Sequence, residues 1–210
     1  MSSFRVPEAF RPIFEKAELY VQRRFNQVVC KPEEGTIRIG GERYVWIRCE
    51  SLYLSWFERM AAAFGEEIAR EFIYNTAREI GRSDSEAFAA RMQVKAGVER
   101  LAAGPIHFAH AGWAFVDILA DSAPATDESY FLHYYHPNTF ESEVSQRRGK
   151  KTNACACHFS AGYSSGWCSA AFGLEVHGRE IRCTARGDQT CEFIMAPSDK
   201  LDGHAQRLLG

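Results

Sequence analysis

The sequence predicts an α+β fold, sandwich-like, in which an antiparallel sheet packs against helices and a metal-clipped hairpin closes the C-terminal part. Three observations lead to this prediction. Helical apolar spacing dominates the first half of the chain, short apolar segments bounded by turn residues follow it, and potential metal ligands cluster near the end. The length of 210 residues suits one domain, or one domain with a small appendage.

Composition argues against several classes of function. The formal net charge is −2 and no long basic run occurs, so nucleic acid is not expected as a direct partner. The first residues lack the apolar segment of a secretory signal, and the most apolar stretch, 106–120, is too short to cross a membrane. Seven cysteines without an export signal favour free thiols or metal binding in a reducing cytoplasm over disulfides.

The first half of the chain reads as helices around one hairpin. Residues 8–27 carry apolar side chains at roughly helical spacing, and Pro12 falls where it should start or kink that helix. The segment 36–48 alternates on both sides of Gly40 and Gly41, which predicts a β-hairpin. Three further helices are expected, over residues 50–64, 66–80 and 83–101.

The second half is expected to contain the sheet. The apolar run 106–119 predicts a strand with a break at Gly112, the run 130–136 predicts a second strand, and 139–144 would extend the sheet. The remaining elements are a buried helix over 154–172, a closing hairpin over 174–186 and 190–195, and a helix over 199–209.

Four residues around the closing hairpin have the chemistry of a metal site. Cys183 and Cys191 flank the turn 186–189, so two adjacent strands could bring their sulfurs together, and Cys157 would come from the preceding helix. Glu180 would add a carboxylate. Because side chains three apart on a regular strand point to opposite faces, Glu180 and Cys183 need a bend or bulge between them.

Other interpretations of the cysteines remain open at this point. His177 and Cys155 are alternative fourth ligands, and no CxxC pair is present. A free cysteine is also often a small buried hydrophobic residue, which is the expectation for Cys30, Cys49 and Cys168.

Aromatic residues in the middle of the chain suggest a ligand pocket. His107, Trp113 and Phe115 would share one face if 106–119 were a regular strand, and Tyr163 on the buried helix could face the same cavity. An ordinary aromatic core with one satisfied histidine is the competing interpretation.

No catalytic or nucleotide-binding motif stands out. The chain has no nucleophile elbow, P-loop or dinucleotide fingerprint. Glu128, Glu141 and Glu143 read as solvated loop and strand-edge groups. The expectation is therefore that the chain is not an enzyme.

Several stretches resemble a known family. GPIHFAHAGWAFVDI, YFLHYYHPNTFES, CHFSAGYSSGWCSAAFG and REIRCTARGDQTCEF are similar to the sensor domains of XylR/DmpR-type regulators, bacterial activators of aromatic catabolism. The last two stretches resemble the 4-vinyl reductase domain, and the region before them resembles the XylR N-terminal region. The resemblance implies an N-terminal dimerisation segment (1–33), a ligand-sensing domain (34–197) whose 4-vinyl reductase portion covers about 138–197, and the start of a linker helix (198–210).

The resemblance also implies a site. A structural zinc ion would be held by Cys157, Glu180, Cys183 and Cys191, next to a pocket for a phenol or a simple arene. In phenol-sensing members a histidine and a tryptophan hold the hydroxyl group. His107 is the candidate histidine, whereas the tryptophan position falls in 134–137, which contains no tryptophan. The full set of expected ligand-binding residues is His107, Trp113, Phe115, Tyr135, His136 and Tyr163.

The partners implied by the resemblance are a small aromatic effector, a second copy of the chain and an output domain. Dimerisation would use the N-terminal segment, with 6–26 as the dimer helix. The output domain would be a sigma-54-type AAA+ ATPase or a diguanylate cyclase. The alternatives from other classes are an enzyme acting on a tetrapyrrole or vinyl group, and a dimerisation scaffold whose cavity has lost its ligand.

Overall fold

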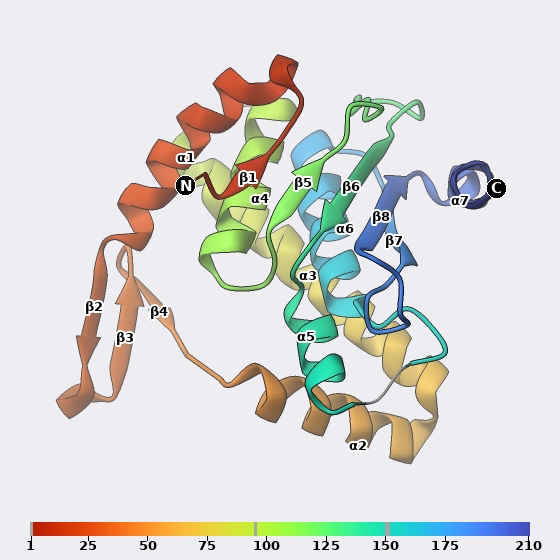
Figure 1. Cartoon of the computed structure of the whole chain (residues 1–210). Coiled ribbons are helices and arrows are strands. Elements are labelled where there is room, and N and C mark those ends of the chain that lie inside the picture. The colour runs from red at the N-terminus through yellow and green to blue at the C-terminus, as the bar shows by residue number, and fades with distance from the viewer. Residues whose placement is uncertain (1, 95, 150–151) are drawn as a thin grey trace.

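The computed structural model describes residues 2–94, 96–149 and 152–210, and it has the expected α+β architecture (Figure 1). The predicted segments 1–33 and 34–197 include residues 1, 95, 150 and 151, which lie outside this described part. The strands are β1 (Phe4–Arg5), β2 (Val28–Lys31), β3 (Thr36–Ile39), β4 (Glu42–Tyr44), β5 (Val116–Ile118), β6 (Leu132–His136), β7 (His177–Arg182) and β8 (Cys191–Ala196). The helices are α1 (Arg11–Phe25), α2 (Ser55–Phe64), α3 (Glu66–Met92), α4 (Val98–His110), α5 (Phe140–Arg147), α6 (His158–Phe172) and α7 (Leu201–Leu209).

The strands form two separate sheets. The main sheet has the order β1-β5-β6-β8-β7, in which β1 pairs with β5 in parallel and all other neighbours are antiparallel. Helices α4 and α6 cover one face of this sheet, and α7 covers part of the other (Figure 1). The second sheet, β2-β3-β4, is a ribbon that extends away from the body.

Helices α3 and α6 pack against each other along most of their length, and glycines allow the contact. A Cβ atom added to Gly81 of α3 would lie 2.1 Å from the carbonyl oxygen of Tyr163, and one added to Gly166 of α6 would lie 1.8 Å from that of Arg78. The predicted break near residue 81 is therefore wrong. α3 is one helix of 27 residues, and Gly81 serves the close approach of two backbones instead of ending a helix.

The predicted strand over 106–119 is also wrong. α4 continues to His110, and only Val116–Ile118 is a strand. Every residue from Leu101 to Phe108 is buried, so the apolar run has no polar face whose spacing could distinguish helix from strand.

The segment 139–144 does not extend the sheet but begins α5. The Thr139 hydroxyl accepts a hydrogen bond from the Ser142 backbone N–H at 3.0 Å and caps the helix. This local cap outweighs the apolar alternation that suggested a strand.

The other predicted elements are confirmed within one or a few residues at their ends. α1 has Pro12 in its first turn, β3 and β4 form the hairpin around Gly40 and Gly41, and α6 is the buried helix. The closing hairpin is β7–β8, followed by α7. Strand β2 was not predicted. No described helix is both long and apolar enough to cross a membrane.

Candidate functional site

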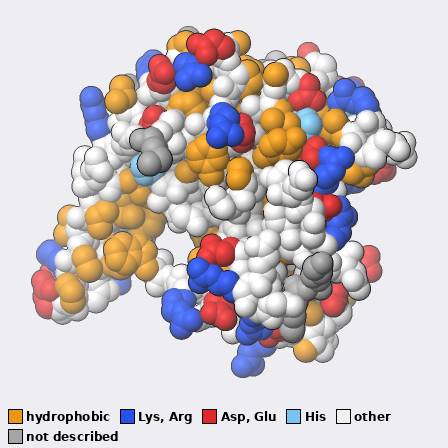
Figure 2. All heavy atoms as spheres, viewed as in Figure 1, with side chains coloured by type: hydrophobic (Ala, Val, Ile, Leu, Met, Phe, Trp, Pro, Cys, Tyr) orange, Lys and Arg blue, Asp and Glu red, His pale blue; other side chains and the backbone are white. Residues whose placement is uncertain are grey.

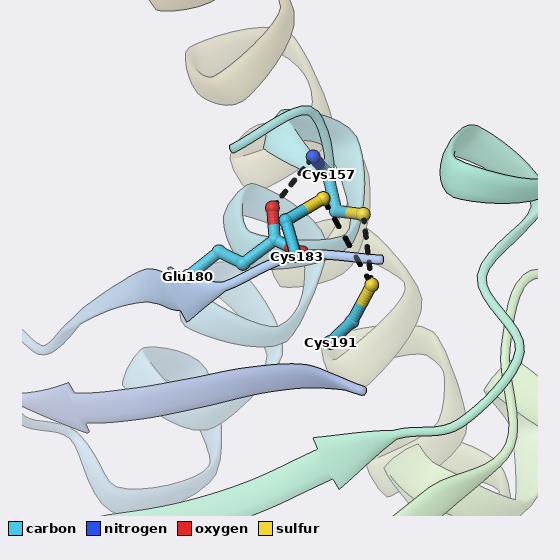
Figure 3. A group of neighbouring side chains, drawn as sticks. All are labelled: Cys157, Glu180, Cys183 and Cys191. Carbon is cyan, nitrogen blue, oxygen red and sulfur yellow. Dashed lines mark hydrogen bonds between the residues drawn. The ribbon is translucent and has the colours of Figure 1, made fainter. Parts of the chain in front are cut away.

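Three cysteines and one glutamate converge at the end of the closing hairpin (Figure 3). The Sγ atom of Cys191 lies 3.8 Å from that of Cys157 and 4.0 Å from that of Cys183. One ligand atom from each of the four residues, Glu180 included, lies within 4.8 Å of the others. Tetrahedral coordination with metal–sulfur bonds of about 2.3 Å separates two sulfurs by about 3.8 Å. The spacing therefore suits a four-coordinate metal ion.

The fold brings these residues together by three local devices. Cys157 is the N-cap residue of α6, and Cys191 is the first residue of β8. A register shift between Glu180 and Arg182 marks a bulge in β7. This is the irregularity that the sequence requires if Glu180 and Cys183 are to face the same side.

The Glu180 carboxylate has one oxygen bonded and one oxygen free. Oε2 accepts a hydrogen bond from the Cys157 backbone N–H at 2.9 Å, whereas Oε1 is buried and has no hydrogen-bond partner among the described residues. Burial and the nearby Cys191 sulfur raise the pKa of Glu180 to about 9. A cation at the centre of the group would satisfy the free oxygen and remove the cost of burying it.

Hydrogen bonds support the sulfurs from outside the group. The Thr139 hydroxyl lies 3.1 Å from Cys157 Sγ, and the backbone N–H and hydroxyl of Thr184 each lie 3.4 Å from Cys191 Sγ. Hydrogen bonds from Cys157 and Cys183 lower the pKa of Cys191, so its sulfur is the natural thiolate of the group. Such supporting contacts orient metal ligands and tune their basicity.

The alternative ligands lie outside this group. Cys155 is half-buried, and His177 lies 3.8 Å from the Glu175 carboxylate. Cys168 is buried as expected, but Cys30 and Cys49 are exposed, so they are not the small core residues that the sequence suggested. The donor set is thus three sulfurs and one carboxylate, all protein-supplied, which is typical of a structural metal site with no open position.

A second feature is a small apolar cavity between α4, α6 and the main sheet. Its volume is ≈ 30 Å³, which is room for one or two water molecules. Its lining residues include Leu101, Phe108, Val116, Leu132, Tyr134, Tyr163, Ser164, Trp167 and Cys168. Pockets for small ligands are mostly apolar with a few fixed polar groups, and this lining has that character. A ligand the size of an aromatic ring would have to push the walls apart.

Two buried polar side chains on the cavity-facing side of β6 have unpartnered atoms. The Tyr134 hydroxyl and both ring nitrogens of His136 make no hydrogen bond among the described residues. His136 is 0% exposed and packs against Phe108 and Phe193, with ring centroids 5.6 and 4.5 Å away. Burial lowers the pKa of His136 to about 3 and raises that of Tyr134, so both are neutral near pH 7. Unpaired buried groups of this kind cost free energy unless a ligand satisfies them.

His107 takes part in a buried chain of hydrogen bonds. Its Nδ1 lies 2.9 Å from the Tyr163 hydroxyl, which donates to Asp84 Oδ2 at 2.8 Å. Because a carboxylate only accepts and a hydroxyl has one proton, Nδ1 of His107 must be the donor to Tyr163. Burial and the positive charge of Arg24 lower the pKa of His107 to about 3, so its Nε2 is left as an acceptor.

The remaining expected ligand residues lie away from the closed cavity. Trp113 packs against Phe140 and Phe159, with ring centroids 5.2 and 4.7 Å away, and lines an open groove together with Phe115. Tyr135 is on the opposite face of the sheet, where it pairs with Asp117 and Glu192 of the neighbouring strands.

The structure thus gathers only part of the expected ligand set. Tyr163, His107 and His136 lie around the cavity wall, and the other three lie elsewhere. His107 and Trp113 do share the wall of another open groove, which runs between α4 and the segment after the ribbon. The shared strand face that the sequence suggested for these two residues is wrong, because His107 lies on a helix.

Sequence reasoning missed several residues of this region. Glu141 is not solvated but fully buried, and it accepts hydrogen bonds from the backbone N–H groups of Phe159 and Ser160 at 2.8 and 2.9 Å. It therefore caps the N-terminus of α6 beside Cys157. The cap at Thr139 was the signal that could have revealed α5, and with it the inward direction of Glu141.

Comparisons with known proteins agree with these features. Residues 25–121 match the XylR_N family, described as an activator of aromatic catabolism, and residues 141–197 match the 4-vinyl reductase domain. The crystal structure of the phenol-responsive sensory domain of the transcription activator PoxR with phenol is similar at a TM-score of 0.76 and 22% identity, covering 93% of this chain and 96% of that one. A vinyl-4-reductase family protein from Methanocaldococcus jannaschii is similar at a TM-score of 0.43 and 15% identity, covering 90% and 95%. No curated protein matches the chain.

The fold and the two family matches define an α+β module of the 4-vinyl reductase type. More particularly, the chain joins an XylR_N segment to a 4-vinyl reductase domain, and the resemblance to XylR/DmpR-type sensor domains is confirmed.

Proposed function

We propose that this chain is the sensor module of a bacterial signalling or transcription regulator and that it binds a small aromatic effector in the cavity between α4, α6 and the main sheet. The XylR_N match and the likeness to the PoxR sensory domain support this class of function. The observation that carries it is the pairing of an apolar cavity with buried, unpartnered polar atoms on Tyr134 and His136. An ordinary core would satisfy those atoms internally.

The effector would be an arene with a hydroxyl group. Apolar walls suit the ring, and the hydroxyl would find neutral partners on β6 and α4. His107 offers an acceptor at Nε2, because its Nδ1 proton is directed to Tyr163. A phenol-like effector therefore fits better than a carboxylate, for which the cavity wall offers no cation among its lining residues.

Binding would widen the cavity. At ≈ 30 Å³ the cavity is far smaller than the pockets of about 300 Å³ or more that enclose small ligands, so β6, α4 or α6 would move as the effector enters. A movement of the wall on binding is what a sensor needs in order to report its ligand, because a ligand shifts only an equilibrium between states that it binds differently.

We assign a structural zinc ion to Cys157, Glu180, Cys183 and Cys191. Three sulfurs and a carboxylate are ligands that zinc accepts in tetrahedral sites, and the unpartnered Glu180 Oε1 supports the assignment. The metal would tie α6 to the β7–β8 hairpin and contribute to folding. Metal analysis of reduced, folded protein should find one zinc per chain, and X-ray absorption should show sulfur and oxygen ligands. A metal-free folded preparation would contradict the assignment.

The dimer surface is proposed to include the ribbon. On α1, the face formed by Phe14, Ala17 and Val21 is buried within the chain itself. By contrast, hydrophobic side chains are exposed over the ribbon arm and the segment that follows it (Figure 2). Trp46 is 66% exposed, and Val28, Val29, Val45 and Ile47 accompany it. Apolar clusters of this kind favour association with a second copy, so the segment 1–33 would act together with 36–47.

The signal is proposed to pass to an output domain in the cytoplasm, either a sigma-54-type AAA+ ATPase or a diguanylate cyclase. The sensing part would correspond to 34–197 and the route to the output domain to 198–210. The family matches at 25–121 and 141–197 are compatible with this division.

Calorimetry with phenol, toluene and benzoate tests the proposed function. Phenol should bind most tightly, and Tyr134→Phe or His136→Phe should weaken phenol binding by about tenfold or more if either group supplies a hydrogen bond. Trp113→Phe is the matched control, because Trp113 lies outside the cavity and should leave affinity unchanged.

Three outcomes would contradict the proposal. Weaker binding in Trp113→Phe with wild-type binding in Tyr134→Phe and His136→Phe would move the effector to the open groove that Trp113 and His107 share. Absence of binding by all three compounds would favour a scaffold. A pigment absorbing in the purified protein would favour a tetrapyrrole enzyme.

A further inference from the structure

The face of the main sheet opposite the cavity holds the C-terminal helix. A small apolar cluster there joins the sheet to α7, which contributes Leu201, Ala205 and Leu208. The sheet contributes Phe131, Ile181, Ile194 and Ala196. This cluster is separate from the main core, so α7 is attached by a limited set of contacts whose loss would free it.

A chain of charged groups runs beneath the same helix. His133 of β6 has both ring nitrogens in contact with carboxylates: Nδ1 lies 2.9 Å from Asp121, and Nε2 lies 2.8 Å from Glu192 of β8. The other oxygen of Glu192 pairs with Arg182 of β7. Arg182 in turn donates through its second terminal nitrogen to the backbone carbonyl of Leu208 at 2.9 Å. The chain therefore leads from the strand next to the cavity to the last turn of α7.

The members of this chain depend on one another. Both contacts of His133 need an N–H group, so the imidazole is protonated between the two carboxylates. Glu192 is only 3% exposed, so it is stable as an anion only while His133 and Arg182 face it. Removing one member leaves a buried charge without a partner, which makes the arrangement cooperative.

The same strand carries the cavity wall. His133 and Tyr134 are neighbours on β6, and successive strand residues point to opposite faces, so His133 faces α7 while Tyr134 lines the cavity. Their partners on β8 are Ile194 and Phe193. A displacement of β6 that lets Tyr134 meet a ligand therefore also displaces His133 relative to Glu192.

We propose that His133, Glu192 and Arg182 are positioning residues that hold the C-terminal turn of α7 against the sheet and make that attachment depend on the position of β6. Effector binding at Tyr134 then changes how firmly α7 is held. This coupling rests on the proposed function, whereas the holding of α7 by the three residues does not.

Hydrogen exchange of residues 201–209 tests both parts, with phenol as the probe. Without phenol, Glu192→Gln should accelerate exchange in the last turn of α7 by about tenfold, the change that corresponds to about 1.4 kcal/mol of local stability. The matched control is Asp202→Asn, which breaks the exposed contact of Arg179 with α7 at 2.6 Å and leaves Glu192 in place. Equal acceleration in both variants would overturn the positioning role.

With phenol bound, the wild-type chain should change its exchange over 201–209, and Asp202→Asn should respond in the same way. Glu192→Gln should bind phenol within about threefold of wild type, below 1 kcal/mol, yet lose the response. A wild-type chain that binds phenol without any change in α7, or a Glu192→Gln variant that keeps the full response, would overturn the coupling. If phenol does not bind the wild-type chain, the proposed coupling to this effector fails together with the proposed effector, and the comparison without phenol still decides the positioning role.

His133→Gln is the second variant, because it lies on β6 and not beside the cysteines. It should reproduce the faster α7 exchange while metal content stays at the wild-type value. Arg182→Lys keeps the charge but supplies one compact donor in place of a fork, so it should give an intermediate rate. Wild-type exchange rates in both variants would contradict the proposal.

Discussion

The cysteine corner and the cavity end of the main sheet are built in opposite ways. At the corner, the sulfurs accept supporting hydrogen bonds, and the one free oxygen, Glu180 Oε1, belongs to a group that can hold a cation. At the cavity, Tyr134 and His136 bury polar atoms that nothing in the described chain satisfies. The first region adds stability to the fold, whereas the second gives up stability and keeps hydrogen bonds in reserve for a ligand.

The largest effect is expected at the corner. Cys183→Ala removes a ligand, so the protein should lose its metal and the β7–β8 hairpin its order, at a cost of about 5 kcal/mol or more. Metal analysis and thermal unfolding followed by circular dichroism measure this. Cys30→Ser is the control, because Cys30 is an exposed thiol on the ribbon. A metal-free Cys183→Ala protein with wild-type Tm would remove the corner's role in stability.

The next effect concerns α6, which extends from the corner to the cavity. In Gly166→Ala the new methyl group would lie 1.8 Å from the Arg78 carbonyl oxygen, so α3 and α6 must move apart. We expect a loss of about 3 kcal/mol in the free energy of unfolding, measured with urea. Gly203→Ala on α7 meets no atom within 4 Å and should be neutral or stabilising by up to about 1 kcal/mol. Similar values for the two variants would show that the helices can separate freely.

A pH effect should separate the buried histidines from the rest. The pKa of His107 is about 3 in the folded chain and about 6.5 when unfolded, so its contribution is complete above pH 6.5 and is lost as pH falls toward 3. His107→Phe should reduce the slope of stability against pH near pH 5 by about 1.4 kcal/mol per pH unit. His177→Gln is the control, because His177 is one-third exposed. An unchanged slope in His107→Phe would mean that His107 is accessible to protons.

The smallest effect has the opposite sign. Tyr134→Phe removes a buried hydroxyl without a partner, so the effector-free protein should become more stable by about 1 kcal/mol while phenol binding weakens. Thermal unfolding with and without phenol measures both changes together. Destabilisation of the free protein would show that the hydroxyl is satisfied internally, and it would make the cavity an ordinary part of the core.

The corner could be predicted from sequence because its geometry is local. Cys183 and Cys191 flank one turn, and the need for a bulge beside Glu180 follows from strand geometry alone. The cavity could not be predicted in this way. The helix around His107 is buried on all sides, so its periodicity is hidden, and Gly81 resembles a helix stop until α6 is seen against it. Tyr134 gains its meaning only from the absence of a partner, which no residue pattern records.

Helix α6 carries a consequence of its own. Its first turn is held by Cys157 and Glu141, and its middle supplies Tyr163 and Trp167 to the cavity wall. A rigid rod fixed at one end transmits any loosening of that end to the rest of its length. A cell starved of the metal would therefore hold a chain that responds poorly to its effector even where the effector is abundant, so nutrient status and chemical sensing would meet in one helix.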